Sequence, residues 1–423
     1  MTLPRILTIM GSGETAPTMV KTHRSLVERL GEAPRAVVLD TPYGFQENAP
    51  ELATRAQDYF RKSVGLTIEV AGLQQVKGAD DLVLAQGLSR VRDANYLFAG
   101  PGSPTYTLRQ WANSPVPAEI AEKLRHGGVV TFASAAALTL GRYTVPVYEI
   151  YKVGEDPYWL DGLDLLAEMD LHVAVIPHYD NAEGGHHDTR FCYLGERRLR
   201  ILEDQLPDGV HVLGIDEHTG IVIDLDTEQV TVVGNGTITV RVRGESTVYP
   251  TGSELHLDNL RSPGSTHTSG AAVHAARPAA ESAAPADSDA GRPSLATDTA
   301  RCERAFNEAI ESRNAEDAAR AVLELETSIH AWSADTNQSE DGDRARAALR
   351  SMIVKLGQAA SGGLADPRSV VGPFVDGLLA IRSIVRAEKR YDLSDVVRDQ
   401  LLAAGVEVRD TKEGVQWEMR SPE

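Results

Sequence analysis

A low-complexity stretch at residues 262–297 constrains the fold most, because it separates two segments of different character. The stretch is rich in Ala, Pro, Ser and Gly, and it contains neither an aromatic residue nor an apolar period. Such a composition cannot bury a core and is typical of a flexible linker. In a chain of 423 residues it predicts two domains, 1–258 and 299–423, joined by a disordered linker over 259–298.

The first segment alternates apolar runs with helical stretches. Helices are expected around residues 25–30 and 117–124, and this alternation predicts a mostly parallel sheet covered by helices on both faces. After Gly209, alternating residues between Asp-Thr-Glu and Gly-Asn-Gly turns predict an antiparallel finish to the sheet. The expected parallel strands are 5–10, 36–40, 66–70, 96–99, 129–132 and 172–176.

The segment GGVVTFASAAALTLG, residues 127–141, places a serine between a buried strand and a helix of small residues. Small neighbours are needed where a strand turns sharply into a helix and presents a nucleophilic hydroxyl. Ser134 is therefore a candidate nucleophile. The alternative is that Ser134 only caps the helix that follows it.

Two further strand ends carry polar residues, and the carboxyl ends of parallel strands share one edge of a sheet. A serine needs a base within hydrogen-bond reach and a group that orients the base. His178 is the candidate base and Glu149 the candidate orienting acid. The amides of Gly102 and Ala135 are the candidate oxyanion hole.

These residues lie in FAGPGSPTYTL, FASAAALTLG, YEIYKVGEDPYWLDGLDLL, VIPHYD and LGIDEHT. Over residues 1 to about 250 the chain resembles the S51 peptidases, the family of dipeptidase E and cyanophycinase. The resemblance implies a flavodoxin-like sheet related to class I glutamine amidotransferases, with a serine elbow, a Gly-rich oxyanion loop and a histidine after the next strand. It also implies an acid 15 residues beyond the serine, which is Glu149. The chain departs from the family at Ala136, where relatives have glycine, and in its Gly-Pro-Gly-Ser loop.

The residues after His178 are expected to shape specificity. The resemblance implies arginines that hold an acidic substrate group, and guanidinium groups bind carboxylates bidentately. Arg190 and Arg198 are the candidates, together with Ser103 and Asn181, and the alternative is that the charges form a solvated face. A metal cluster of His178, His186, His187 and Asp188 is a weaker alternative, and Cys192 is expected to be a buried, inert thiol. We expect neither a metal nor another cofactor.

The second segment has helical periodicity up to Gly405, followed by alternating residues that predict a hairpin. Its FNEAIESRNAEDAARAV and AIRSIVRAEKRYDLSDVVRDQLLAAGVEVRDTKEGVQW resemble the C-terminal helical and anticodon-binding part of cysteinyl-tRNA synthetase. The synthetase's catalytic motifs are missing from the chain, so tRNA charging is not expected. The resemblance leaves open a cysteine-specific tRNA or a partner protein as the ligand of residues 299–423.

Charge gives weak support to tRNA binding. From residue 299 onward the chain has 17 Lys and Arg and 22 Asp and Glu, so its net charge is −5. Trp417 is a candidate for stacking on a base. The alternative is that the basic residues form a solvated face and that Trp417 belongs to the core of the hairpin. The candidate basic stripe consists of Arg382, Arg386, Lys389 and Arg390.

Composition bounds the remaining possibilities. The formal charge of −19 disfavours non-specific binding to nucleic acid or membranes. Two cysteines, no apolar run of membrane-spanning length and no secretory signal predict a cytoplasmic protein, and a homodimer is left open. The sequence thus predicts a serine hydrolase acting on a small acidic or Asp-derived peptide or amide, with a tRNA-synthetase-like accessory domain. The alternative is an inactive hydrolase fold that serves as a tRNA- or protein-binding module.

Overall fold

The computed structural model describes residues 3–31, 34–182, 187–263, 294–333, 341–361, 367–411 and 414–419. The chain divides into two compact units, one of Met1–Thr297 with Ile329–Gly342 and the other of Asp298–Ser328 with Asp343–Glu423. Residues 264–293, most of the predicted linker, lie outside the described residues. The described part of the first unit extends beyond residue 258, because the short helix α8 (Asp258–Arg261) buries Leu260.

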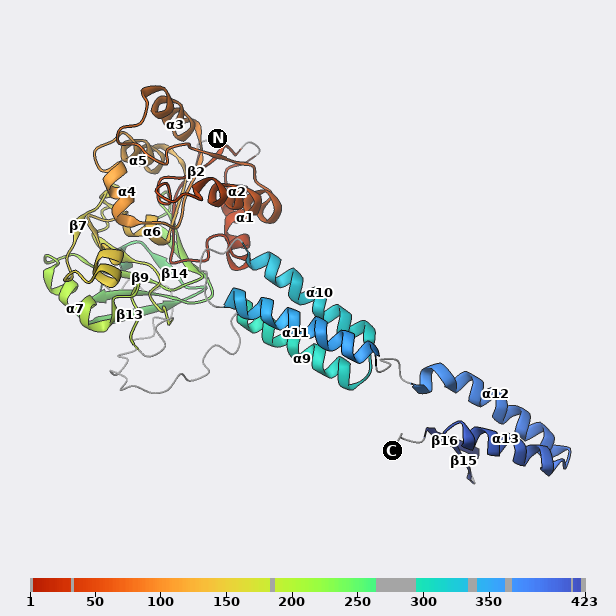
Figure 1. Cartoon of the computed structure of the whole chain (residues 1–423). Helices are drawn as coiled ribbons and strands as arrows, with labels where there is room; N and C mark the ends of the chain where they lie inside the picture. Colours follow the sequence, from red (N-terminus) through yellow and green to blue (C-terminus); the bar gives the residue numbers. More distant parts are fainter. Residues whose placement is uncertain are drawn as a thin grey trace. The chain divides into compact units, whose positions relative to one another are not determined.

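The first unit is built on an eight-stranded, mostly parallel sheet, which confirms the predicted mixed α/β class (Figure 1). The strands β2, β4 and β5 in the middle of this sheet are buried apolar runs, and parallel strands need such runs because both faces are covered, whereas the edge strand β3 exposes Glu69. Its order is β14-β11-β10-β1-β5-β4-β2-β3. The parallel strands are β1 (Arg5–Met10), β2 (Ala36–Leu39), β3 (Ile68–Val70), β4 (Tyr96–Ala99) and β5 (Gly128–Ala133), and the antiparallel ones are β10 (Thr219–Asp224), β11 (Gln229–Gly234) and β14 (Glu254–His256).

Helices pack on both faces of this sheet, as alternate strand residues require. Val38 of β2 faces the cluster formed with α1 (Val20–Glu28), α2 (Ala49–Tyr59) and the π-helical turn η2 (Phe60–Val64). Val37 and Leu39 face the opposite cluster, to which α3 (Asp81–Asp93), α4 (Pro104–Trp111) and α5 (Val116–His126) contribute. The sheet is therefore the buried middle layer of this unit.

A second sheet contains the strand that precedes His178. Its order is β13-β12-β9-β8, with β8 (Val173–Ile176) and β9 (His211–Ile215) parallel, and β12 (Thr237–Val242) and β13 (Glu245–Pro250) antiparallel. The strand at 172–176 was expected in the first sheet, but β10 pairs with β1 and occupies the edge that a continued parallel sheet would need. Val175 and Leu213 instead pack into the core of the main sheet, and α7 (Gly195–Gln205) covers the other face.

The second unit contains most of the C-terminal helical residues and the hairpin that follows them, as predicted. Figure 1 shows α9 (Leu295–Glu311), α10 (Ala315–Trp332) and α11 (Asp341–Ser361) lying along one another. They are followed by α12 (Pro367–Ala387) and α13 (Tyr391–Ala403). Gly405, at a φ of +83°, ends α13 as predicted, and β15 (Val406–Thr411) pairs with β16 (Gly414–Met419).

Among the described residues, no helix combines the length and the apolar composition that crossing a membrane would require.

Candidate active site

Three strand ends meet at the candidate site. β5 ends one residue before Ser134, β8 ends two residues before His178, and β9 ends two residues before Glu217. β8 and β9 are parallel neighbours, so the turns that follow them lie side by side, and the amide of Tyr179 donates to the carbonyl of Ile215 at 3.1 Å. The fold thus gathers side chains that are far apart in the sequence.

Ser134 lies on a strained turn between β5 and the short helix α6 (Ser134–Leu138). Its φ is +50°, a left-handed conformation that is uncommon for a residue with a side chain. The residue before the helix is Ala133, and no side chain caps the helix, so the capping alternative is wrong. The hydroxyl of Ser134 instead faces the imidazole of His178, with Oγ 2.9 Å from Nε2. This is the geometry of a nucleophile elbow.

The other ring nitrogen of His178 faces a carboxylate. Nδ1 lies 2.8 Å from Oε1 of Glu217, and the two side chains are 12% and 24% exposed. Burial disfavours the charged form of Glu217, but hydrogen bonds from His178 and Asn181 outweigh burial and hold the pKa of Glu217 below its ordinary value. A carboxylate kept ionised here can hold the ring with Nδ1 protonated, which leaves Nε2 to accept the proton of Ser134.

The prediction that Glu149 orients His178 is wrong in this structure. An imidazole has two nitrogens, and Ser134 and Glu217 engage them both. Glu149 begins the π-helical turn η3 (Glu149–Val153), where its Oε2 accepts a hydrogen bond from Thr105 Oγ1 at 3.0 Å. The spacing of 15 residues therefore identified an acid beside α4 and not the partner of the histidine.

The loop after β4 lies against the start of α6. The amide of Ala136 donates to the carbonyl of Gly100 at 3.2 Å, and the methyl of Ala136 is buried in the core. The structure thus accommodates an alanine at position 136, where the resemblance described above implies glycine. Gly102 has a φ of +145°, and a Cβ there would lie 2.0 Å from the carbonyl oxygen of Pro42. Glycine is required at this position by both backbone conformation and space.

The four candidate substrate-binding residues have partners within the protein. The hydroxyl of Ser103 caps α4 by accepting from the amide of Tyr106 at 3.1 Å, and Asn181 is buried against Glu217. Arg190 makes two hydrogen bonds of 2.8 Å to Asp188. Arg198 donates to the carbonyl of Leu194 at 3.4 Å. An acidic substrate group would have to compete with Asp188 for Arg190.

The alternative metal cluster involves a residue that the structure does not describe. His186 lies outside the described residues. Asp188 pairs with Arg190, which lowers the pKa of Asp188 to about 2, and His187 Nε2 lies 3.4 Å from the hydroxyl of Tyr151. Within the described ranges, no group of three His, Cys, Asp or Glu side chains is arranged to hold a metal ion.

Cys192 is buried, and burial raises the pKa of its thiol. It lies within Phe191–Cys192–Tyr193, a run of three residues with φ between +55° and +65°, and its amide donates to the carbonyl of His178 at 3.0 Å. Such a thiol has little thiolate at neutral pH. The strained run therefore supports the backbone of the histidine and does not supply a second nucleophile.

The candidate tRNA-binding stripe is divided by the structure. Arg382 is buried and forms two hydrogen bonds of 2.8 and 2.9 Å with Asp410, to which Arg386 also donates at 2.7 Å. Lys389 and Arg390 remain exposed in the turn between α12 and α13. The prediction of one exposed stripe is therefore wrong for Arg382, because this face of α12 packs against the hairpin.

Trp417 is a half-buried member of the apolar cluster between α12, α13 and the hairpin. Its Nε1 donates to Asp376 at 3.0 Å, and the guanidinium of Arg368 lies 5.8 Å from its ring centroid. The structure thus gives Trp417 the packing role that was the alternative to base stacking.

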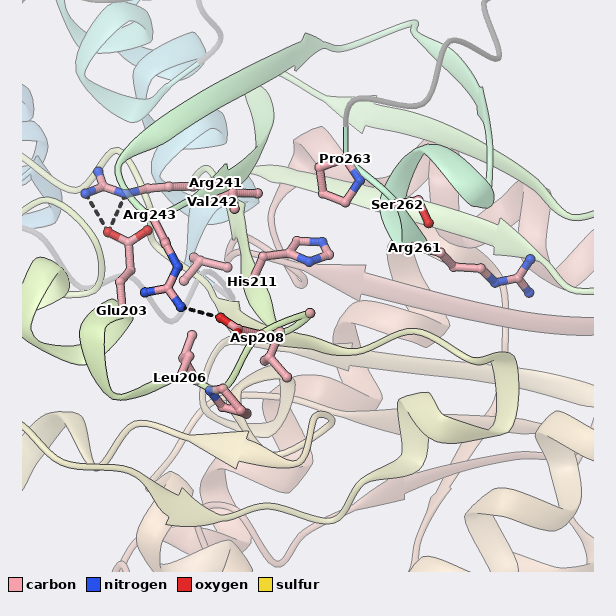
Figure 2. A pocket seen from close by; sticks show the side chains of 14 residues that line it. Glu203, Leu206, Asp208, His211, Arg241, Val242, Arg243, Arg261, Ser262 and Pro263 are labelled. Atoms are coloured by element: carbon pink, nitrogen blue, oxygen red, sulfur yellow. Dashed lines mark hydrogen bonds and ion pairs between the residues drawn. The ribbon is translucent and has the colours of Figure 1, made fainter.

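A cavity of about 290 Å³ opens at the start of β9, at the opposite end of that strand from Glu217 (Figure 2). Three arginines line it, and each has a carboxylate partner: Arg241 pairs with Glu203, Arg243 with Asp208 and Arg261 with Glu228. None of Ser134, His178 and Glu217 lines this cavity. The candidate chemistry therefore belongs to the strand ends and not to this cavity.

The first unit is a mixed α/β protein whose fold is that of a known peptidase. It is similar to the crystal structure of a peptidase from an acI-B1 Actinobacterium, at a TM-score of 0.50 and 22% identity. The match covers 60% of this chain and 98% of the peptidase. At this identity the likeness establishes the fold.

The C-terminal part is similar to curated cysteine–tRNA ligases. The chain is 33% identical over 126 residues to the ligase of Beutenbergia cavernae and 32% identical over 123 residues to that of Chlorobium chlorochromatii. The matches cover 27% and 28% of this chain, and 26% and 21% of the ligases. The chain therefore spans about a quarter of the length of these relatives. No model of a known protein family matches the chain.

Proposed function

We propose that the first unit is a serine-type hydrolase of a peptide or amide bond. The observation that carries this proposal is the continuous contact from Ser134 Oγ to His178 Nε2 at 2.9 Å and from His178 Nδ1 to Glu217 Oε1 at 2.8 Å. The strained φ of Ser134 supports it, because such strain holds a nucleophile in place. The likeness in fold to a peptidase is consistent with this chemistry.

In the proposed reaction, Ser134 Oγ attacks the carbonyl carbon and His178 Nε2 takes the hydroxyl proton. Glu217 stabilises the imidazolium that forms. The amides of Ala135 and Gly102 donate hydrogen bonds to the oxyanion. The amide of Ala135 lies in the first turn of α6 and has no intrahelical acceptor. His178 then returns the proton to the leaving amine, and water hydrolyses the acyl-serine.

The test combines a covalent probe with a substrate panel. A fluorophosphonate should label wild-type protein at Ser134 and should not label Ser134→Ala. Glu217→Gln should lower kcat by about 10²- to 10⁴-fold, the scale of general acid–base catalysis. Glu149→Gln is the matched control, because it neutralises the acid that does not contact the imidazole. Labelling that survives Ser134→Ala, or a larger loss in Glu149→Gln than in Glu217→Gln, would overturn the assignment.

For substrate class we retain a small acidic or Asp-derived peptide as the proposal. Aspartyl and β-aspartyl dipeptides should be compared with neutral and basic dipeptides, and Arg190→Gln with wild type. A loss confined to acidic substrates in Arg190→Gln supports the proposal. Equal turnover of the three classes contradicts acidic specificity and leaves the hydrolase chemistry standing. An unlabelled wild-type protein would favour the inactive binding module.

We also propose that the C-terminal part recruits tRNA, on the likeness to cysteine–tRNA ligases. Lys389 and Arg390 are exposed cations of the predicted stripe, whereas the exposed Arg386 pairs with Asp410. Filter binding of cysteine tRNA to the full chain should weaken as salt rises, and the slope of log K against log salt should be on the order of −0.7 to −0.9 per phosphate contact, as for single- and double-stranded nucleic acids. Replacing both residues by alanine should reduce that slope. Binding without salt dependence, or none, contradicts the proposal and leaves a protein partner or a second copy.

A further inference from the structure

The turn that carries His178 also forms hydrogen bonds with Glu217. We call residues His178–Asn181 the histidine turn. Asn181 Nδ2 donates to Glu217 Oε1 at 3.2 Å, and Asp180 Oδ1 accepts from the amide of Glu217 at 2.7 Å. We propose that Asp180 and Asn181 are positioning residues that hold Glu217 against His178, an inference that rests on the proposed hydrolase function.

The contacts fix Glu217 at both ends. The hydrogen bond to Asp180 holds the backbone, while Asn181 and His178 converge on one carboxylate oxygen at 3.2 and 2.8 Å. A glutamate side chain otherwise retains considerable rotamer freedom. Two donors on the same oxygen select one orientation. The histidine turn therefore supplies both the base and the groups that aim its acid.

Burial separates this role from substrate binding. Asn181 is fully buried, and its backbone is tied into the turn by its amide, which donates to the carbonyl of His178 at 3.2 Å. The hydroxyl of Thr189 donates to the carbonyl of Asn181 at 3.4 Å. The side-chain amide of Asn181 donates to Glu217, so Asn181 contacts the acid of the site.

Because several carboxylates surround the histidine turn, the protonation of His178 depends on the side chain at position 181 being neutral. Burial, together with the carboxylates of Asp216 and Glu217, raises the pKa of Asp180 above its ordinary value. Asp216 itself accepts from the amide and the hydroxyl of Thr237 at 2.8 Å. The imidazole of His218 and the thiol of Cys192 are further titratable groups that interact electrostatically with Glu217. Another carboxylate at position 181 would repel Glu217 and favour protonated His178.

The experiment titrates His178 directly by NMR in the full chain labelled with [15N]histidine, with the signal assigned from its loss in His178→Gln. Asn181→Asp should raise the measured pKa of His178 by about one unit. Asn181→Ala should slow fluorophosphonate labelling of Ser134 by about tenfold, the lower end of the loss seen when residues that support metal ligands are replaced. Asp180→Asn, which keeps an acceptor, should recover most of the rate lost in Asp180→Ala.

The control is Asn95→Ala, a buried asparagine whose Oδ1 accepts from the amide of Arg35 at 2.7 Å in another part of the fold. It should lower stability and leave both readouts unchanged. The inference would be overturned if Asn181→Asp and Asn181→Ala both label at the wild-type rate and leave the measured pKa of His178 unchanged. A wild-type protein that does not label refutes the hydrolase function alone, because the titration still decides whether the turn positions Glu217.

Discussion

Alanine at Gly102 should disable the site, whereas alanine at Gly100, two residues earlier in the same loop, should be tolerated. At Gly102 a Cβ would lie 2.0 Å from the carbonyl oxygen of Pro42 and 2.8 Å from the amide nitrogen of Tyr43. At Gly100 the nearest atoms, from Glu14 and Phe98, would be 3.5 Å away, which is ordinary contact. The two changes add the same methyl group and differ only in the space that receives it.

The magnitude follows from three costs at Gly102. A φ of +145° strains any residue with a Cβ by about 1–3 kcal/mol. Contact with the carbonyl of Pro42 then displaces the loop by about 1 Å, and a misplacement of this size costs on the order of 10²-fold in rate. Loss of one oxyanion donor costs about 10²- to 10³-fold in kcat. Because domains are stable by about 5–15 kcal/mol, the variant should remain folded while the reaction fails.

The assay is the rate of fluorophosphonate labelling at Ser134, measured beside a urea unfolding curve for each variant. We expect Gly102→Ala to label at least about 100-fold more slowly than wild type, and Gly100→Ala to label within a few-fold. Labelling of Gly102→Ala at nearly the wild-type rate would refute the oxyanion role of this amide. An equal loss in both variants would show that the loop is sensitive to any side chain.

Three further predictions concern stability and reactivity. Arg241→Met should destabilise the first unit by about 3–5 kcal/mol in urea unfolding, because it strands the buried Glu203, whereas Arg243→Met, which breaks an exposed pair, should cost at most about 1 kcal/mol. The hydrogen bonds of Arg241 lower the pKa of Glu196 to about 2. Their contribution to the free energy of unfolding is therefore complete above the ordinary carboxyl pKa and is lost as pH falls from about 4.5 to 2. Urea midpoints measured across that range should fall less in Glu196→Gln than in wild type. Cys192 should react with a thiol reagent only on unfolding, and rapid native labelling would contradict its burial.

The sequence predicted the main sheet because most of its parallel strands are apolar runs bounded by turns. That signal reports burial and not the identity of the neighbouring strand. β8 and β9 join a second sheet because β10, more than 200 residues after β1, pairs with β1 and occupies its edge. Whether these strands form one sheet or two depends on the pairing of β10 with β1, and a local hydrophobic pattern carries no information about that pairing.

The same distinction explains the candidate site. Ser134 and His178 could be found because each follows an apolar strand at the edge where ligands bind. Glu217 could not be selected, since 39 residues separate it from His178 and several acids follow strands in this unit. Its signal was the acid in GIDEHT, directly after β9, which becomes meaningful once β9 is known to pair with β8. Likewise the four-residue spacing of Arg382 and Arg386 predicted one helix face correctly and did not reveal that the face meets Asp410.

The groups proposed to perform the reaction, Gly102, Ser134, His178 and Glu217, all belong to the first unit. The proposed chemistry therefore needs no residue from the C-terminal helices and hairpin. If that part recruits tRNA, its effect is to raise the local concentration of a tRNA-linked substrate, which changes KM for that substrate and not the intrinsic reactivity of Ser134. Fluorophosphonate labelling should then be the same with and without cysteine tRNA. A tRNA-dependent labelling rate would instead require that tRNA binding alters the geometry around Ser134.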